Sequence, residues 1–104
     1  MNDIRGIYKH FKGGLYEVYG VCSSKNTGQI FVLYKPLYNE TGFWIRLYSM
    51  FFSKVSYDKM DRNRFEIVNA VDNMINEKEL TVLNSETYDV YIIKKENDEF
   101  ILSE

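Results

Sequence analysis

The stretch VLYKPLYNETGFWIRLYSMFF, residues 32–52, predicts two β-strands joined by a turn, and it decides the fold class. The turn falls on residues 39–42, Asn-Glu-Thr-Gly, which combine turn-forming polar side chains with a glycine. The next strand, residues 43–48, is rich in the aromatic and β-branched residues that favour sheets. Ser49 then begins a short turn that is expected to lay three apolar side chains over an open end of the sheet, those of Met50, Phe51 and Phe52.

The strand over residues 43–48 has two faces of different character. Side chains alternate across a strand, so one face is apolar throughout and is typical of a core: Phe43, Ile45 and Leu47. The other face carries Trp44, Arg46 and Tyr48, which sets the only Trp of the chain beside a permanent cation. This aromatic-cationic face is the strongest functional signal in the sequence.

Length and composition predict a single domain over residues 1–104. Hydrophobic residues make up 45% and aromatic residues 16%, which excludes a disordered chain and favours a sheet. The formal charge of -2 argues against bulk attraction to nucleic acid or an anionic membrane, although a local basic patch stays open. No apolar run approaches the roughly 20 residues that span a bilayer. We therefore expect a soluble, cytoplasmic protein without a membrane partner.

Residues 6–22 predict a β-hairpin around Gly13-Gly14. Two glycines between β-rich runs favour a two-residue turn, because primed turns need positive φ at their centre. That turn sets His10 opposite Glu17. The predicted register therefore gives one shared face to four side chains, those of Tyr8, His10, Lys12 and Glu17.

The remaining segments predict more strands and one short helix. Residues 29–35 are apolar at consecutive positions, which indicates a strand buried on both faces. Residues 53–62 predict a short strand followed by a loop. From residue 68 to 78, one apolar stripe has helical spacing: Val68, Val71, Met74 and Ile75. Strands return at residues 80–83, 88–94 and 100–102, the last two forming a C-terminal hairpin.

Together these elements predict a mainly β fold of the α+β class. Short strands with turn signals between them favour a small curved antiparallel sheet or a partly open barrel of SH3-like size. One short helix and a C-terminal β-hairpin complete this predicted fold.

An ordered set of spaced residues links the first two-thirds of the chain: Gly6-x-Tyr8-x-His10-Phe11-Lys12-Gly13, Tyr16-Glu17-Val18, Val32-x-Tyr34, Leu37-Tyr38, Trp44-x-Arg46, Met50-Phe51 and Arg64-Phe65. This pattern resembles the DUF1653 family, small and mainly β bacterial and phage proteins without an assigned function. The resemblance implies a DUF1653-like core over residues 6–66, with residues 67–104 as an added helix and hairpin. Two departures stand out. Residues 23–26, Ser-Ser-Lys-Asn, replace a His-Ser-Glu run that the family usually carries, and Leu47 replaces a Pro.

The aromatic-cationic surface is the candidate ligand site. Bases and sugars stack on aromatic rings, and arginine binds phosphate through its planar fork. The alternative is a scaffold in which Arg46 stacks on Trp44 and pairs with Glu17 or Glu40. The candidate ligand-binding residues are Trp44, Arg46, Tyr8, His10, Lys12, Glu17 and Tyr34.

His10 and Cys22 are weak candidates for catalysis. The predicted partner of His10 is Glu17, and a cross-strand ion pair explains that arrangement without chemistry. Cys22 lies far from His10 in the predicted hairpin, so we expect it to be a small buried hydrophobe. One Cys and one His do not supply a usual structural zinc site. We therefore predict no catalytic residue, no metal ligand and no cofactor.

A non-enzymatic binding module for a small anionic or nucleotide ligand is the function that the sequence favours. A small barrel that binds single-stranded nucleic acid ranks second, because the acidic net charge opposes it. A protein-protein adaptor that uses the C-terminal hairpin as an edge ranks third, and an enzyme ranks last. The oligomeric state is left open, a homodimer included.

Overall fold

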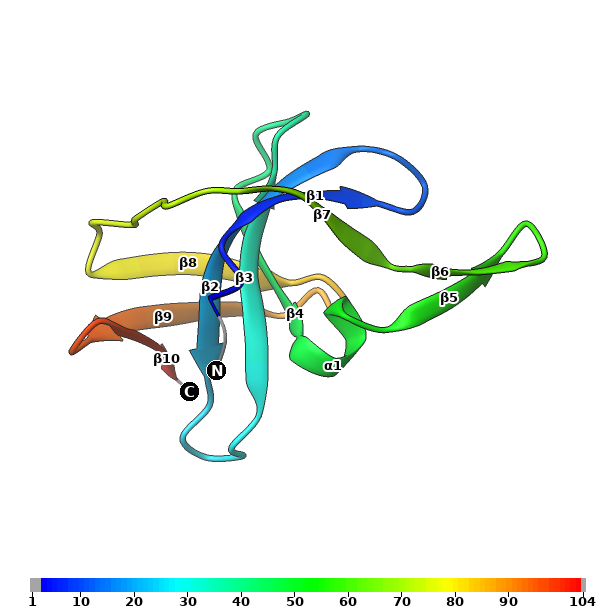
Figure 1. Ribbon diagram of the computed structural model, residues 1–104. Helices are drawn as coiled ribbons and strands as arrows, with labels where there is room; N and C mark the ends of the chain where they lie inside the picture. The colour runs from blue at the N-terminus through cyan, green and yellow to red at the C-terminus, as the bar shows by residue number, and fades with distance from the viewer. Residues whose placement is uncertain (1–2, 104) are drawn as a thin grey trace.

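The computed structural model describes residues 3–103 as ten β-strands and one short α-helix (Figure 1). In chain order they are β1 (Gly6–His10), β2 (Leu15–Ser23), β3 (Ile30–Pro36), β4 (Phe43–Leu47), α1 (Tyr48–Phe51), β5 (Lys54–Tyr57), β6 (Met60–Asn63), β7 (Phe65–Ala70), β8 (Glu79–Asn84), β9 (Val90–Glu96) and β10 (Glu99–Ser103). The mainly β fold with a small barrel and one short helix is confirmed. Within the described range, no helix has the length and apolar character needed to cross a membrane.

Six strands close into a barrel. Their order is β2-β3-β4-β8-β9-β10, and β10 returns to pair with β2. This closing pairing is parallel and short, with Phe100 opposite Cys22 and Ile101 opposite Ser23. Outside the barrel, β1 extends the sheet beyond β2, and β7 extends it beyond β1. Closure pairs strand edges that would otherwise stay open to other chains.

Apolar side chains fill the barrel. The buried members are Cys22, Phe31, Leu33, Ile45, Ile75, Leu80, Val82, Ile93 and Leu102. Phe43 and Leu47 pack against this cluster from the same face of β4 as Ile45, as the alternation predicted. Cys22 is 1% exposed, and burial raises the pKa of its thiol to about 12. This confirms Cys22 as a small buried hydrophobe with no thiolate at neutral pH.

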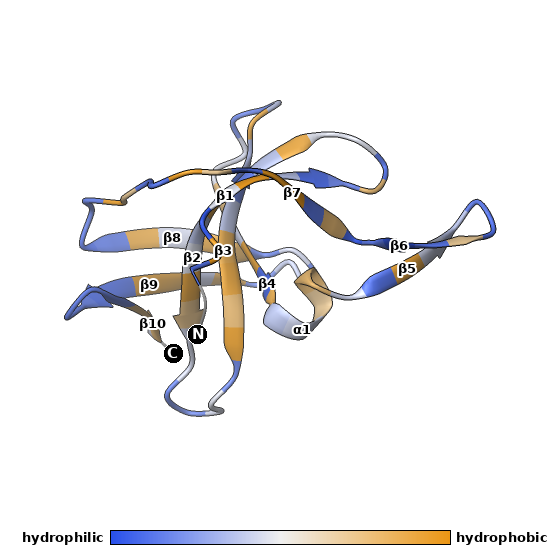
Figure 2. Cartoon of the chain, in the orientation of Figure 1, coloured by the Kyte–Doolittle hydropathy of each residue, from blue (hydrophilic) through white to orange (hydrophobic). Residues whose placement is uncertain are grey.

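A second apolar cluster lies outside the barrel. Its buried members are Ile4, Tyr8, Val18, Val32, Tyr34, Phe51 and Phe65. The rings of Phe51 from α1 and Phe65 from β7 stack with centroids 4.0 Å apart and planes 3° apart. Residues 31–34 of β3 are all buried and alternate between the two clusters, so this strand is buried on both faces as predicted. Figure 2 shows β3 coloured mostly as hydrophobic.

A bulge lets β2 serve both clusters. Val18 packs in the outer cluster and Cys22 inside the barrel, although alternation alone would put both on one face. The register of β2 with β3 shifts between Val18 and Gly20. Gly20 has φ 130°, a backbone conformation that L side chains rarely adopt. The extra residue therefore turns the later side chains of β2 to the opposite face.

The hairpin of β1 and β2 forms, but the predicted two-residue turn is wrong. The last pair of β1 with β2 is Lys9 with Leu15, so residues 10–14 connect the paired positions, and the backbone N–H of His10 donates to the carbonyl of Gly14 at 3.1 Å. The Phe11 ring stabilises this longer loop through an edge contact with Tyr57, at 5.2 Å between centroids. The strand pairs are Tyr8 with Tyr16 and Ile7 with Glu17. Glu17 therefore lies on the opposite face from Tyr8, which corrects its predicted place beside His10.

Residues 68–78 contain no helix, so that prediction is wrong. Residues 65–70 instead form β7, which pairs along the open edge of β1. Of the predicted apolar stripe, Ile75 is buried, whereas Val68 and Met74 are exposed. A helical spacing over so short a segment is a weak signal, and the free backbone groups of β1 outweigh it.

The C-terminal segment is part of the barrel rather than an addition to it. β8 pairs in parallel with β4, and β9 and β10 form the predicted hairpin. That hairpin turns through Asn97 and Asp98, both at positive φ, as a primed turn requires. The turn between β8 and β9 is tied to β4, because the backbone N–H of Ser85 donates to the carbonyl of Ile45 at 2.9 Å.

Strands β5 and β6 form a separate hairpin that projects from the body (Figure 1). The sequence predicts only one strand here, and β6 was not predicted. The turn uses Asp58 and Lys59, both at positive φ. Neither residue is a glycine, which removes the usual sequence signal for a primed turn.

Candidate functional site

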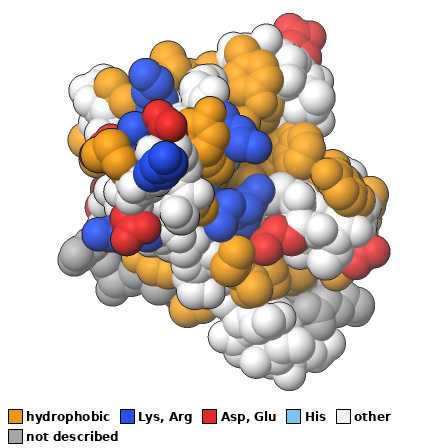
Figure 3. Space-filling view, turned by 90° about the vertical axis from the view of Figure 1, so that its right-hand side faces the viewer, with side chains coloured by type: hydrophobic (Ala, Val, Ile, Leu, Met, Phe, Trp, Pro, Cys, Tyr) orange, Lys and Arg blue, Asp and Glu red, His pale blue; other side chains and the backbone are white. Residues whose placement is uncertain are grey.

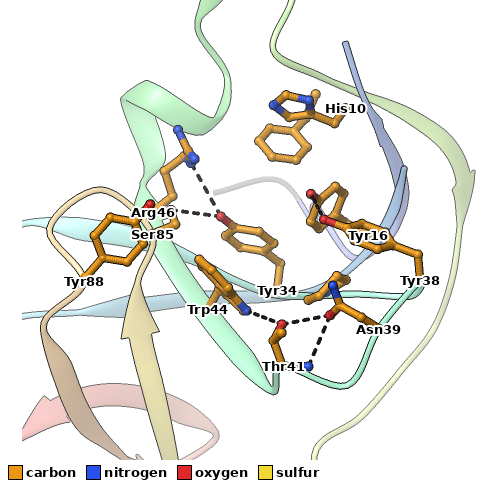
Figure 4. A pocket seen from close by; sticks show the side chains of 12 residues that line it. His10, Tyr16, Tyr34, Tyr38, Asn39, Thr41, Trp44, Arg46, Ser85 and Tyr88 are labelled. Carbon is orange, nitrogen blue, oxygen red and sulfur yellow. Dashed lines mark hydrogen bonds between the residues drawn. The ribbon is translucent and has the colours of Figure 1, made fainter. Parts of the chain in front are cut away.

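A cavity of about 190 Å³ opens beside β3 and β4, outside the barrel (Figure 4). Seven rings line it: His10, Tyr16, Tyr34, Tyr38, Trp44, Phe65 and Tyr88. The other lining residues are Pro36, Asn39, Thr41, Arg46 and Ser85. Tyr34 lies opposite Trp44 in the pairing of β3 with β4, so these two lining side chains are neighbours on one face of the sheet. Among the lining residues that the structure describes there is no carboxylate, and Arg46 is the permanent cation.

Arg46 is half-buried, and among residues 3–103 its guanidinium has no acidic partner. Its Nε donates to the hydroxyl of Tyr34 at 3.5 Å, and its Cζ lies 5.9 Å from the ring centroid of Phe65. Within residues 3–103, none of the ion pairs includes Arg46. The alternative in which Glu17 or Glu40 pairs with Arg46 is therefore not formed. A guanidinium carries five N–H donors, so most of them remain available.

Hydroxyl groups supply the neutral polar part of the wall. The hydroxyls of Tyr16 and Tyr38 are 2.7 Å apart, and that of Tyr34 donates to Ser85 Oγ at 3.0 Å. Burial, and then the hydrogen bond with Tyr38, raises the pKa of Tyr16. This phenol therefore stays protonated at neutral pH and keeps a donor at the cavity.

Trp44 is held by its indole nitrogen. Its Nε1 donates to Thr41 Oγ1 at 2.9 Å, and Thr41 Oγ1 donates in turn to Asn39 Oδ1 at 2.9 Å. Other rings of the wall meet edge to face, as Tyr16 does with Tyr34 and Phe65. Among the ring pairs of the described residues, none involves Trp44. The turn at residues 39–42 thus orients an indole that has no aromatic partner.

His10 is a neutral imidazole at the edge of the cavity. The backbone N–H of Lys12 donates to its Nδ1 at 3.2 Å, which leaves the proton on Nε2. Burial is the main cause that lowers the pKa of His10, and the charges of Arg46, Arg64 and Lys12 lower it further. The three cations show that the field at this end of the cavity is positive.

The lowered pKa of His10 predicts a dependence of stability on pH. Below its ordinary pKa of about 6.5, the unfolded chain binds a proton that the folded chain resists. The unfolded state then binds more protons, so the free energy of unfolding should fall as the pH drops from 7.5 to 5.5. Urea midpoints measured across this range should fall less for His10→Gln. Parallel curves for the two proteins would contradict this prediction.

The structure brings four of the seven predicted site residues to one cavity: Trp44, Arg46, His10 and Tyr34. Tyr8 is not among them, because its side chain is buried in the outer cluster and its hydroxyl donates to the carbonyl of Ile4 at 2.8 Å. Lys12 stays on the exposed hairpin loop, with its Nζ 5.7 Å from the Phe11 ring.

Glu17 lies away from the cavity, on the other face of β2. It accepts hydrogen bonds from the hydroxyl of Tyr19 and from Asn73 Nδ2, both at 3.0 Å. The wrong hairpin register is the reason for this error: Glu17 pairs with Ile7 instead of His10, and a shift by an odd number of residues reverses the face.

Eight lining residues were not predicted as site residues: Tyr16, Pro36, Tyr38, Asn39, Thr41, Phe65, Ser85 and Tyr88. The correct register of β2 with β3 would have predicted Tyr16 as a lining residue. Tyr16 lies opposite Pro36, two residues from the pair of Val18 with Tyr34, and so shares a face with Tyr34. Ser85 and Tyr88 have no such local signal, because they reach the cavity through the pairing of β8 with β4.

Several residues of the family-like pattern support the wall without lining it. Arg64 Nε donates to the carbonyl of Met50 and to Ser53 Oγ, both at 3.1 Å, which ties the residue before β7 to α1 and the segment that follows it. Gly6 lets β1 approach β7, since a Cβ atom there would lie 2.6 Å from the carbonyl oxygen of Asn69. Between residues 3 and 103, no group of three or more His, Cys, Asp or Glu side chains could hold a metal ion.

Comparison with known proteins gives a family but no activity. Residues 6–67 match DUF1653, described as a protein of unknown function. A crystal structure of a DUF1653 protein from Bordetella bronchiseptica is similar, with a TM-score of 0.60 and 27% sequence identity over 70% of this chain and 96% of that chain. No curated protein matches the sequence. Because the family match spans more than half of its residues, this chain belongs to the DUF1653 family.

Proposed function

We propose that this protein is a non-enzymatic binding module that takes a small anionic ligand in the Arg46 cavity. The observation that carries the proposal is the half-buried Arg46, which lines a cavity of about 190 Å³ to which the described residues bring no carboxylate. A half-buried charge without a partner is unfavourable, and an anion would relieve it.

The surrounding donors suit an anion. Arginine binds carboxylate and phosphate oxygens through paired N–H groups. The bonded pair of hydroxyls of Tyr16 and Tyr38 and the Nε2–H of His10 add neutral donors at the same cavity. Arg64 and Lys12 add positive potential, as their effect on His10 indicates.

The size of the cavity limits the ligand. Sites for drug-sized molecules usually enclose about 300–1,000 Å³, whereas this cavity measures about 190 Å³. One ring system or one small anion therefore fits inside, and the rest of a larger ligand would lie at the mouth.

A titration panel tests the proposal. Isothermal titration of the full chain with inorganic phosphate, pyrophosphate, acetate and nucleoside 5′-monophosphates is expected to show saturable binding of at least one anion. Uncharged ribose and free nucleosides serve as controls, and they should bind more weakly than the charged members. Absence of binding by every anion at low salt would contradict the proposal.

The charge distribution favours single-stranded nucleic acid as the second candidate. Residues 1–67 hold ten Lys and Arg against six Asp and Glu, while residues 68–104 hold three against nine. Lys9, Lys54 and Arg62 line another cavity between β1 and the β5–β6 hairpin, together with Asp61 and Glu66. Figure 3 shows Lys and Arg side chains gathered on the face that carries this hairpin, with acidic side chains among them.

An oligonucleotide arm in the same titration separates the two candidates. Binding of oligo(dT) or oligo(rU) that is tighter than that of any mononucleotide, and that weakens steeply with salt, would favour the nucleic-acid function. Equal or weaker binding of the oligonucleotide would favour the small ligand.

A further inference from the structure

The mouth of the Arg46 cavity is completed by residues outside the family match. The match ends at residue 67, yet Ser85 and Tyr88 line the cavity. Both belong to the turn between β8 and β9, which brings a hydroxyl and a large ring to a wall otherwise built by residues 10–65. Figure 4 draws Tyr88 on the same side of the cavity as Trp44 and Arg46, across from Tyr38 and Asn39.

The turn that carries Tyr88 is rigidly held. Asn84 is buried, and its Oδ1 accepts from the backbone N–H groups of Glu86 at 2.9 Å and Thr87 at 3.2 Å. The backbone N–H of Tyr88 donates to the carbonyl of Asn84 at 2.8 Å. With Ser85 tied to Ile45, these bonds fix where the Tyr88 side chain leaves the backbone.

The backbone conformation at position 88 is unfavourable for a tyrosine. Its φ is 63°, a left-handed conformation that glycine or asparagine adopts more easily than a bulky residue. Its side chain is 70% exposed, and within residues 3–103 it enters neither a ring pair nor a side-chain hydrogen bond. A large, mostly exposed ring held in an unfavourable conformation, with no ring pair or side-chain hydrogen bond to the described residues, indicates a functional use.

Trp44 offers a matching surface. Its indole nitrogen is bonded to Thr41, while its ring has no aromatic partner in the described part of the chain. Two aromatic side chains without ring partners therefore lie at a cavity whose cation also lacks an acid. A planar ring could pack against them while an attached anionic group reaches Arg46.

We infer that Tyr88, together with Trp44, makes the cavity selective for a planar aromatic ring that carries an anionic group, such as a nucleoside monophosphate, over inorganic anions. This inference rests on the proposed function and adds the ligand class. It also assigns a role to the segment after residue 67. Residues 6–67, which match the family, form most of the cavity, and Tyr88 from the later segment determines which ligand it selects.

The test compares Tyr88→Gly and Tyr88→Phe with the unchanged protein in titrations with AMP, GMP, CMP, UMP and inorganic phosphate. Tyr88→Gly should weaken binding of the preferred nucleotide at least about 5-fold and leave phosphate binding unchanged, because base stacking on one ring contributes that much. Tyr88→Phe keeps the ring and should retain the nucleotide affinity. Tyr57→Ala, which removes an exposed tyrosine away from the cavity, should change neither affinity.

A melting curve shows that the effect is not structural. Tyr88→Gly should raise the melting temperature, because glycine adopts the positive φ without strain, while nucleotide binding falls. Equal nucleotide affinity in Tyr88→Gly and the unchanged protein would overturn the inference, and so would phosphate bound as tightly as every nucleotide. Either result would leave the proposed anion site standing. If the unchanged protein binds no anion at all, the proposed function and this inference are both overturned.

Discussion

Arg46→Gln is expected to weaken binding of the preferred anion about 30- to 150-fold, which corresponds to about 2–3 kcal/mol. The guanidinium is the permanent cation of the cavity, and no carboxylate of the wall competes with a ligand for it. Glutamine keeps a similar length and two N–H donors but removes the charge. Isothermal titration with the anion that binds best to the unchanged protein measures the effect.

Two further variants separate the shape of the group from its charge. Arg46→Lys keeps the charge and loses the planar fork, so its affinity should fall between those of Arg46→Gln and the unchanged protein. Arg62→Gln removes a cation from the projecting hairpin, outside the cavity, and should have little effect at moderate salt. Equal losses for Arg46→Gln and Arg62→Gln would mean that only the overall field matters, which contradicts a site at Arg46.

Arg46→Gln should not destabilise the fold. The guanidinium is half-buried near the charges of Arg64 and Lys12, which act on His10 in the same region. Removing a cation without an acidic partner relieves this repulsion, so the melting temperature of Arg46→Gln should be unchanged or higher. A lost affinity with a kept melting temperature therefore marks a binding residue.

Phe51→Ala is expected to lower the free energy of unfolding by about 3–5 kcal/mol, which is a large part of the roughly 5–15 kcal/mol typical of a domain. Phe51 is fully buried in the cluster outside the barrel. Its ring stacks on Phe65 at 4.0 Å and meets the edges of Tyr34 at 5.3 Å and Tyr8 at 5.5 Å. Truncation would open a cavity among rings that cannot close over it.

Phe52→Ala is the matched control, because it removes the same side chain from the neighbouring position. Phe52 is 37% exposed, so its loss should cost about 1 kcal/mol. Urea midpoints of the two variants measure the difference, and similar midpoints would contradict the role given to the outer cluster. Since Phe65 and Tyr34 also line the Arg46 cavity, Phe51→Ala should weaken anion binding as well.

The central part of the candidate site could be predicted from local sequence. Period-two alternation put Trp44 and Arg46 on one face of a strand, and that face does line the cavity. Tyr34 follows from the pairing of two strands joined by a short turn. These residues lie within one hairpin, so their relative position depends on local geometry.

The rest of the site depended on details that local patterns do not carry. The last pair of β1 with β2 is Lys9 with Leu15, so five residues instead of two separate the paired positions, and this odd change moved Glu17 to the other face. Tyr8 does lie on the predicted face of β1, but its side chain is buried in the outer cluster, which the packing of α1 and β7 creates. Residues 68–78 followed a helical spacing, yet β7 formed because β1 had an unpaired edge.

The sequence by itself determined the strands β1–β4 and β8–β10, which side chains share a face within one strand, and which family the pattern resembles. Those properties follow from residue type and period over a few neighbours. Only the tertiary structure decided which edges meet: β7 with β1, β8 with β4, and β10 with β2. Backbone hydrogen bonds join these edges, and they are nearly the same for every residue type. The placement of Tyr88 beside Arg46 therefore follows from non-local strand pairing, which the residue pattern does not encode.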